Sequence, residues 1–233
     1  MKHALLLLLA FYLCSCECSA DIETQHNIST EPHGSIKIAA ALGSKASEVS
    51  GVRCYLNDYE ADYGANATSL PSNATHISTL YRDVLTGGCK VRIMGQPNDV
   101  QLYNASIPIR NGERYTSVLY MDTIGTIATP HLFIAQDDLT GSLAGKRYIR
   151  VINLLANRKS ISAFVDSSAF GSTLSYESST TFIPVDAAIK QIEFVTSSDE
   201  RSSIFFTSKS THLTVVVVDL GGTPQIYTID HSY

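Results

Sequence analysis

Short stretches of alternating apolar and polar residues recur along this chain. Ile36–Ile38, Lys90–Met94 and Lys190–Phe194 each place apolar side chains on one face and charged or polar side chains on the other. This alternation is typical of half-buried antiparallel strands. Tyr115–Tyr120 and Thr214–Val218 are continuous runs rich in β-branched or aromatic residues, which favours central strands. Turns rich in Gly, Asn and Ser separate these segments, so the sequence predicts an all-β antiparallel sandwich.

The second part of the chain repeats the order of the first. Four segments match in the same order, and the offset falls steadily from 113 (Ser35 against Tyr148) to 94 (Thr129 against Thr223). A falling offset means that the loops of the first copy are longer than those of the second, whereas the strands keep their length. This is expected for a duplicated unit. We therefore expect two tandem β-sandwich domains, residues 34–142 and 145–233, that meet at a polar, Gly-bearing linker near 137–145.

The start of the second copy resembles a known bacterial module. Gly145–Asn153 (GKRYIRVIN) followed by Ile161–Asp166 (ISAFVD) is similar to the opening of the domain of unknown function numbered 4397, and Ile107–Asp122 resembles a later part of it. The resemblance covers roughly residues 34–233. It implies tandem immunoglobulin-like β-sandwiches on exported, often lipidated proteins, and it carries no catalytic residue.

The first twenty residues are typical of a signal peptide. A basic start precedes the apolar run 4–13, which is much shorter than the ~20 residues of a bilayer span. Residues 13–16 (LCSC) resemble a lipobox, so cleavage there would leave Cys16 as a lipidated first residue of an outer-membrane or cell-surface protein. Cleavage after Ala20 would instead release a soluble secreted chain. In both cases the polar residues 21–33 form a tether.

Composition and charge exclude one class of partner. The chain has 233 residues, of which 44% are hydrophobic, so it can form one or two packed cores. Its 17 Lys and Arg against 22 Asp and Glu give a formal charge of −5. Without a basic excess there is no electrostatic driving force for phosphate-backbone binding, so we expect no nucleic-acid partner.

Two cysteines lie beyond the leader. Cys54 and Cys89 align with Ala163 and Ile189 of the second copy, so both thiols are expected to point inward on two strands. An oxidising compartment allows a disulfide between them. Closing that loop would stabilise the first domain by roughly 3–4 kcal/mol in the chain-entropy model. The alternative is a pair of buried thiols that never meet.

The insertion in the first copy holds the candidate binding residues. Asp58, Tyr59, Asp62 and Tyr63 lie within the segment DYEADY. Exposed tyrosines with acidic neighbours can stack on sugars or anchor a protein partner. The carboxylates can also bind Ca²⁺ in principle. The alternative is an acidic, solvated loop.

The sequence contains no pattern that predicts catalysis, a cofactor or a metal site. His131, His212 and His231 are scattered without metal-ligand spacing, so we expect them to be solvated or at strand edges. No GxSxG nucleophile elbow is present. We therefore expect no enzyme activity, no cofactor and no metal.

These observations favour a non-enzymatic exported binding or adhesion protein. It would bind an unidentified protein or glycan through loops at the ends of the sandwiches, chiefly residues 57–79. Two alternatives stay open, an accessory subunit of a periplasmic polysaccharide-modifying or export complex and a soluble secreted protein.

Overall fold

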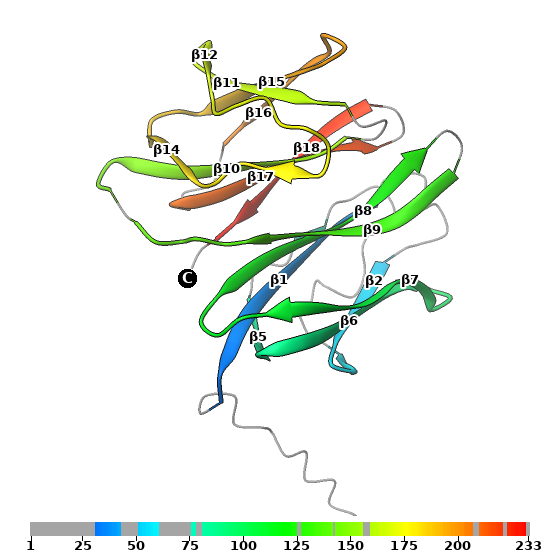
Figure 1. Ribbon diagram of the computed structural model, residues 1–233. Coiled ribbons are helices and arrows are strands. Elements are labelled where there is room, and N and C mark those ends of the chain that lie inside the picture. Colours follow the sequence, from blue (N-terminus) through cyan, green and yellow to red (C-terminus); the bar gives the residue numbers. More distant parts are fainter. Residues whose placement is uncertain are drawn as a thin grey trace, which may run out of the picture.

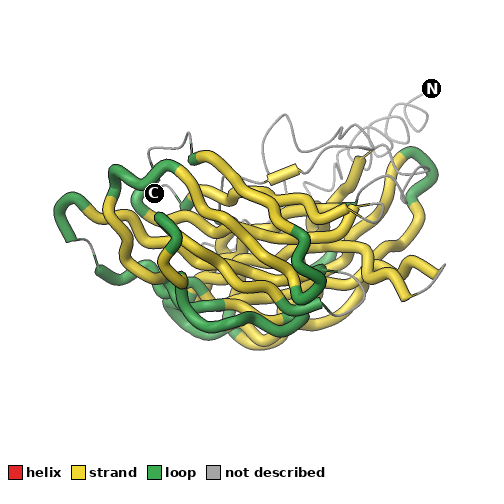
Figure 2. The backbone as a smooth tube through the Cα atoms, turned by 90° about the horizontal axis from the view of Figure 1, so that it is seen from above, coloured by secondary structure: helices red, strands yellow, loops and turns green. Residues whose placement is uncertain are grey.

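The structure is a computed structural model that describes residues 31–42, 51–60, 76–77, 81–124, 127–141, 143–155, 159–206, 210–220 and 223–231. Within these ranges it consists of strands and turns without a helix (Figure 2), so the all-β sandwich prediction is confirmed. The predicted signal peptide at 1–20, with Cys16, and most of the tether at 21–33 lie outside the described residues.

The first half of the chain forms two packed sheets. The inner sheet has the order β4-β1-β8-β9, with β5 also paired to β1, and the outer sheet has the order β3-β2-β6-β7. The strands are β1 (His33–Ala41), β2 (Gly51–Leu56), β3 (Tyr59–Glu60), β4 (His76–Ile77), β5 (Arg82–Leu85), β6 (Gly87–Gln96), β7 (Val100–Ile109), β8 (Arg114–Ile124) and β9 (Ile127–Gln136).

The second half repeats this strand order. Its inner sheet is β13-β10-β17-β18, with β14 paired to β10, and its outer sheet is β12-β11-β15-β16. Each strand therefore has a counterpart nine strands earlier, and the two runs predicted as central strands lie within β8 and β17. The predicted domain boundaries, 34–142 and 145–233, stay a prediction. The strands are β10 (Lys146–Leu154), β11 (Ile161–Val165), β12 (Ser168–Ala169), β13 (Ser178–Ser179), β14 (Ile183–Asp186), β15 (Gln191–Thr196), β16 (Arg201–Phe205), β17 (His212–Leu220) and β18 (Thr223–Asp230).

One strand pairing in each half is parallel, which differs from the antiparallel prediction. β1 runs parallel to β8, with residues 35–41 opposite 114–120, and β10 runs parallel to β17, with 148–154 opposite 212–218. The sequence did not indicate this, because alternation identifies a strand and its faces but not the direction of its neighbour.

Three apolar clusters hold four sheets in a stack. One lies between the sheets of the first half, around Val91 and Leu119, and one between those of the second half, around Ile149 and Phe194. The third joins the two inner sheets to each other, so the order of layers is outer, inner, inner, outer (Figure 1). Its buried members are Ala39, Ala41, Val118, Tyr120, Ala135, Ile152, Leu154, Val216, Val218 and Ile229.

The two halves contribute equivalent positions to this third cluster. Ala39 lies opposite Val118 in the β1–β8 ladder, and Ile152 lies opposite Val216 in the β10–β17 ladder. All four side chains are buried. Each half thus presents the same face to the other, as the subunits of an isologous dimer do. The inner sheets are covered on both faces, which explains the near-continuous burial of β1 and β10.

The predicted disulfide between Cys54 and Cys89 is wrong for this structure, which shows no bond between the two thiols. Both side chains are buried in the first core, as expected. However, Cys54 pairs with Ile93 in the β2–β6 ladder, and Cys89 lies four residues from Ile93 along β6. At ~3.4 Å per residue this offset is about 14 Å, whereas a disulfide needs Cα atoms within about 7 Å.

Both inner sheets end in a strand that carries a proline. Pro130 lies on β9 opposite Met121, and Pro224 lies on β18 opposite Asp219. Proline has no N–H to offer a further strand, so it discourages edge-to-edge pairing. The same position is protected in each half.

Candidate functional site

A pocket opens where the two halves meet. Its volume is about 420 Å³, and its walls come from the end of β9, the linker after it, the start of β10 and the segment that joins β13 to β14. We call it the interface pocket. It is lined by Ile134, Ala135, Gln136, Asp138, Thr140, Tyr148, Arg150, Ser179, Thr180, Thr181 and Phe182.

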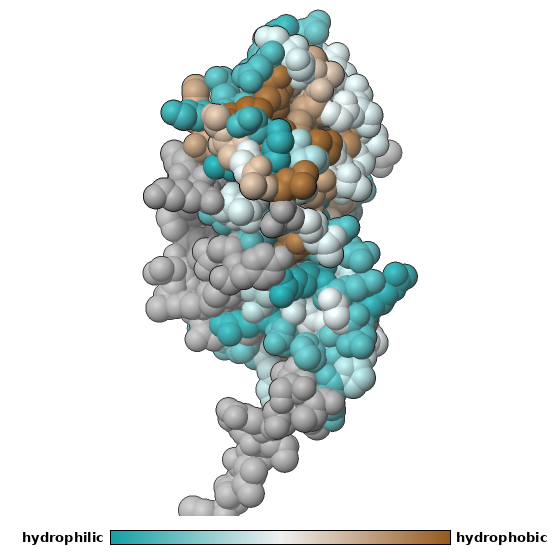
Figure 3. All heavy atoms as spheres, turned by 90° about the vertical axis from the view of Figure 1, so that its left-hand side faces the viewer, coloured by the Kyte–Doolittle hydropathy of each residue, from teal (hydrophilic) through white to brown (hydrophobic). Residues whose placement is uncertain are grey.

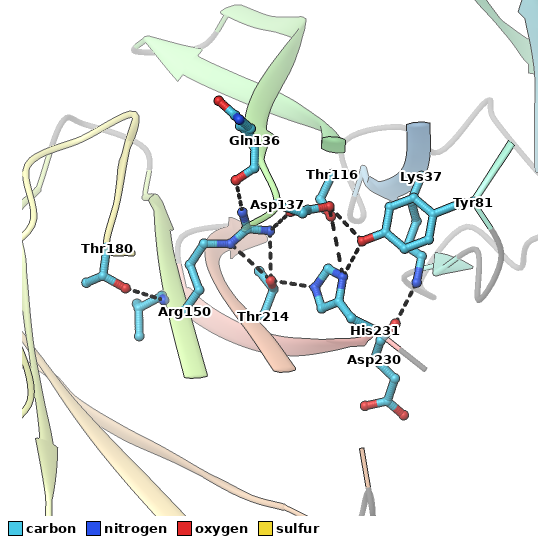
Figure 4. A network of polar contacts seen from close by, with 11 residues as sticks. Lys37, Tyr81, Thr116, Gln136, Asp137, Arg150, Thr180, Thr214, Asp230 and His231 are labelled. Carbon is cyan, nitrogen blue, oxygen red and sulfur yellow. Dashed lines mark hydrogen bonds and ion pairs between the residues drawn. The ribbon is translucent and has the colours of Figure 1, made fainter. Parts of the chain in front are cut away.

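Arg150 brings a positive charge to the pocket, but that charge is neutralised. The Arg150 side chain is 2% exposed, and its Nη2 lies 2.6 Å from Oδ1 of the buried Asp137. Nη1 donates to the backbone oxygen of Gln136 at 2.9 Å. Thr116 donates a further hydrogen bond to Asp137, at 2.7 Å. The ion pair joins β10 to the residue that follows β9, so it bridges the two halves (Figure 4).

The donors and acceptors behind this ion pair fix where the protons lie. Nε and Nη2 of Arg150 both donate to Thr214 Oγ1, at 3.1 and 2.9 Å. That hydroxyl therefore donates its own proton to Nε2 of His231, at 2.7 Å. Tyr81 donates to Asp137 Oδ2 at 2.7 Å, so its oxygen accepts from Nδ1 of His231, also at 2.7 Å. His231 is thus held as the neutral Nδ1–H tautomer.

Burial keeps His231 uncharged. The residue is 1% exposed, and burial lowers its pKa to about 2, with the positive charges of Arg150 and Lys37 acting in the same direction. Burial likewise lowers the pKa of His212. The expectation that these histidines are solvated or at strand edges is therefore wrong. His212 begins β17 and His231 directly follows β18, and both are buried where the two halves meet. The expectation holds for His131, whose side chain is 46% exposed on the edge strand β9.

Lys37 is the counterpart of Arg150 in the first half. Lys37 lies opposite Thr116 in its parallel ladder, as Arg150 lies opposite Thr214. Its Nζ donates to the backbone oxygen of Asp230 at 2.6 Å, which mirrors the bond from Arg150 to the equivalent Gln136. Both cations also lie over an aromatic ring at equivalent positions, Lys37 at 4.5 Å from the Tyr81 centroid and Arg150 at 4.7 Å from that of Phe182. Burial lowers the pKa of Lys37 to about 8.

Aromatic rings form one wall of the interface pocket. Tyr148 stacks on His212 with ring centroids 4.9 Å apart and an interplanar angle of 14°. Phe182 makes T-shaped contacts with His212 and His231, with ring centroids 5.4 Å apart in both pairs. These contacts fix both pocket-lining rings in place, so the wall is formed before any ligand arrives.

A carboxylate stands at the rim of the pocket. Asp138 is exposed, and its Oδ1 accepts hydrogen bonds from the backbone N–H of Thr140, at 3.0 Å, and from the Thr140 hydroxyl. These bonds hold the pKa of Asp138 below its usual value. The group is therefore ionised at neutral pH, and among the described residues nothing donates to its Oδ2, which can act as an acceptor.

A second polar cluster crosses the interface farther along β9. Tyr120 donates to Glu177 and lies 3.0 Å from the hydroxyl of Tyr176. Nδ1 of His131 lies 3.9 Å from Oε1 of Glu177. Glu177 has a φ of +53°, which is uncommon for a residue with a long side chain. Burial raises the pKa of Tyr176 to about 12, so these hydroxyls act as hydrogen-bond donors and acceptors, not as charges.

The binding residues chosen from the sequence do not contribute to the interface pocket. Asp58 lies in the turn between β2 and β3 of the outer sheet, and its Oδ1 is 3.0 Å from Nζ of Lys90. Tyr59 begins β3 and is 75% exposed. Asp62 and Tyr63 lie outside the described residues. On the face shown in Figure 3, hydrophilic surface covers much of the first half, whereas apolar surface gathers on the second.

Sequence reasoning missed Lys37, Asp137, Arg150 and His231. The alternation at Ile36–Ile38 places Lys37 on a polar strand face, and Asp137 belongs to the predicted polar linker. Arg150 lies in the segment matched to that of Lys37, but the sequence assigned it no role. A signal was present. Arg150 is a cation within the otherwise apolar run Ile149–Ile152, and a charge inside such a run needs a buried partner.

Among the described residues, no group of His, Cys, Asp and Glu is arranged to hold a metal ion. In the same part of the chain, no helix has the length and hydropathy to cross a membrane.

The fold and the interface pocket define a tandem β-sandwich protein in which the two repeats share one site. No protein-family model and no curated protein matches the chain. Among solved structures, it is similar to CBMbc, a family CBM26 module of Eubacterium rectale Amy13K solved in complex with maltoheptaose. The sequence identity is 13%, the match covers 83% of this chain and 96% of that chain, and the TM-score is 0.28. The resemblance to the domain of unknown function 4397 stays a prediction.

Proposed function

We propose that this protein is an exported, non-enzymatic binding protein whose two repeats act together as one receptor. The observation that carries the proposal is the interface pocket, a concave site of about 420 Å³ to which both halves contribute. Its volume lies within the usual range for small-ligand sites. The apolar cluster between the inner sheets and the Arg150–Asp137 ion pair fix the two halves relative to each other, so the pocket is preorganised.

The chemistry of the pocket supports binding over catalysis. The described residues that line it include no His, Cys or Lys. The nearest buried titratable groups, Asp137 and His231, are committed to partners within the network and do not reach the lining. General acid–base chemistry needs a group whose pKa lies near neutral pH. The exposed carboxylate of Asp138 lines the pocket, but its hydrogen bonds from Thr140 hold its pKa below the usual value, so it is a weak base.

Export is supported by the leader sequence, with its basic start and the apolar run 4–13. We expect attachment to a membrane through Cys16. The intact mass of the protein purified from its native host checks this expectation. A diacyl or triacyl adduct on Cys16 supports lipid anchoring, whereas a chain that begins at Asp21 without an adduct contradicts it and indicates soluble secretion.

The pocket itself is tested by filling it. Ser179 is exposed and lines the pocket, so Ser179→Trp should occupy the site without disturbing either core. Ser203→Trp, at an exposed position on β16, is the matched control. Ligand-observed NMR with a panel of amino acids, nucleotides, organic acids and saccharides should reveal compounds that bind the native protein and the control but not Ser179→Trp. Binding that is equal in all three proteins, or no binding at all, would overturn the proposal.

A further inference from the structure

The charges around the interface pocket disfavour an anionic ligand. Arg150 is the one cation among the described lining residues. Its charge is paired with Asp137, and four interactions already engage its N–H groups. The other charged lining group is the carboxylate of Asp138, which stays ionised and repels anions. The pocket therefore offers no free positive charge for a phosphate, sulfate or carboxylate.

The pocket instead offers neutral polar groups around its rim. The side chains of Gln136, Ser179 and Thr181 are exposed and have no hydrogen-bond partner among the described residues. An amide supplies both donors and acceptors, and a hydroxyl acts as either. Oδ2 of Asp138 adds an acceptor that can receive two O–H donors. This set matches a ligand with several hydroxyl groups.

The wall of the pocket is aromatic and fixed. Tyr148 and Phe182 are each held by ring contacts with buried histidines. Next to the polar rim, the half-buried Phe182 and the small exposed part of Tyr148 provide apolar surface for the C–H face of a ring that carries hydroxyls at its edges. Small-molecule sites combine such apolar surface with a few placed polar groups.

We infer that the interface pocket binds a neutral saccharide. The ligand's hydroxyls would bond to Gln136, Thr181 and the Asp138 carboxylate, and its C–H face would contact Tyr148 and Phe182. This inference rests on the proposed function and deepens it, because it names the chemical class of the ligand. It excludes uronic acids, sulfated glycans and phosphorylated metabolites as the preferred ligand.

The test uses two sets of probes on the full chain. The neutral set contains cellohexaose, laminarihexaose, maltoheptaose and mannohexaose, and the anionic set contains hexagalacturonate and a heparin hexasaccharide. Isothermal titration calorimetry should show binding of at least one neutral probe and of neither anionic probe. Binding of an anionic probe alone, or of no neutral probe at concentrations up to about 10 mM, would overturn the ligand class.

Three pocket variants and one control locate the binding. Thr181→Val removes a hydroxyl at constant shape and Gln136→Ala removes the amide, and each should weaken the neutral probe about three- to tenfold. Thr173→Val, exposed on the second half away from the lining residues, should leave it unchanged. Asp138→Lys should weaken the neutral probe at least tenfold and create affinity for hexagalacturonate.

The outcomes separate the two proposals. If an anionic probe binds and Thr181→Val weakens it, the pocket is a binding site but the saccharide class is wrong. If a neutral probe binds equally to all pocket variants, the ligand class survives but the pocket is not the site. In that case the function proposed above falls, and Ser179→Trp should leave the same probe bound.

Discussion

Lys37 and Arg150 occupy the same position in the two halves, but only Arg150 has a carboxylate partner. Each lies in an inner strand opposite a threonine, and each donates to a backbone oxygen of the other half. Arg150 meets Asp137, whereas the residue equivalent to Asp137 in the second half is the neutral His231. The duplicated interface has therefore diverged into one ion pair and one buried ammonium whose pKa burial lowers to about 8.

This asymmetry predicts unequal effects of substitution. Asp137→Asn leaves the buried guanidinium of Arg150 without its counter-charge, and we expect the free energy of unfolding to fall by roughly 3–5 kcal/mol. Lys37→Met removes a charge that has no carboxylate partner at hydrogen-bond distance, so the loss should be much smaller. Urea unfolding at pH 7 measures both. Equal losses for the two variants would contradict the difference seen between the halves.

The buried His231 predicts a loss of stability in mild acid. Its pKa is about 2 in the folded protein and ~6.5 in the unfolded chain, so the unfolded state binds the extra proton between these values. Stability from this group is fully present above pH 6.5 and falls as the pH drops, by about 1.4 kcal/mol between pH 7.5 and 5.5. His231→Gln should lack this component. Denaturant titrations of both proteins across this range measure it, and parallel pH profiles would exclude the assignment.

The separation of Cys54 from Cys89 predicts two thiols that stay reduced. Peptide mapping after alkylation of the unreduced, denatured protein should find both residues alkylated, and a peptide linked through these two residues would contradict the structure. In the native protein, Cys89 should react slowly with iodoacetamide, because burial raises its pKa to about 11 and thiolate is the reactive form. Denaturation should restore an ordinary rate.

The equivalent prolines of the two edge strands predict protection against association. Replacing Pro130 and Pro224 by Val restores an N–H to each edge and raises strand propensity. We expect the double variant to form oligomers or aggregates at concentrations where the native protein stays dispersed. Light scattering against concentration measures this. Thr129→Val with Thr228→Val, on the same two strands, is the control, because it raises strand propensity without adding an N–H, and it should not change the association state.

The sequence predicted the strands well because strands have a local signature. Alternation and turn residues identified the all-β class, the central runs within β8 and β17, and the repeat itself. The parallel pairing of β1 with β8 was missed, since local periodicity does not encode the direction of a neighbour. The inward orientation of Cys54 and Cys89 was correct, but their separation along β6 depends on register, which the sequence does not display.

The candidate site was harder to predict because it exists only where the halves meet. Alternation in a strand such as Ser35–Ile38 normally means one buried and one solvated face, so Lys37 was assigned to solvent. Its burial follows from the second half covering the inner sheet. The same holds for Asp137, whose polar neighbours are typical of a linker. A charge repeated at aligned positions of two copies was the informative signal.

The parallel ladder between β1 and β8 has a mechanical consequence. A chain held at its N-terminal side pulls β1 toward its start, while the rest of the half resists through β8 in the opposite direction. The ladder between the two strands extends from the pair Ser35 and Arg114 to the pair Ala41 and Tyr120. Its hydrogen bonds are then loaded in shear, so they must break together and not one after another. A body tethered in this way would resist flow or traction before its first repeat unravels.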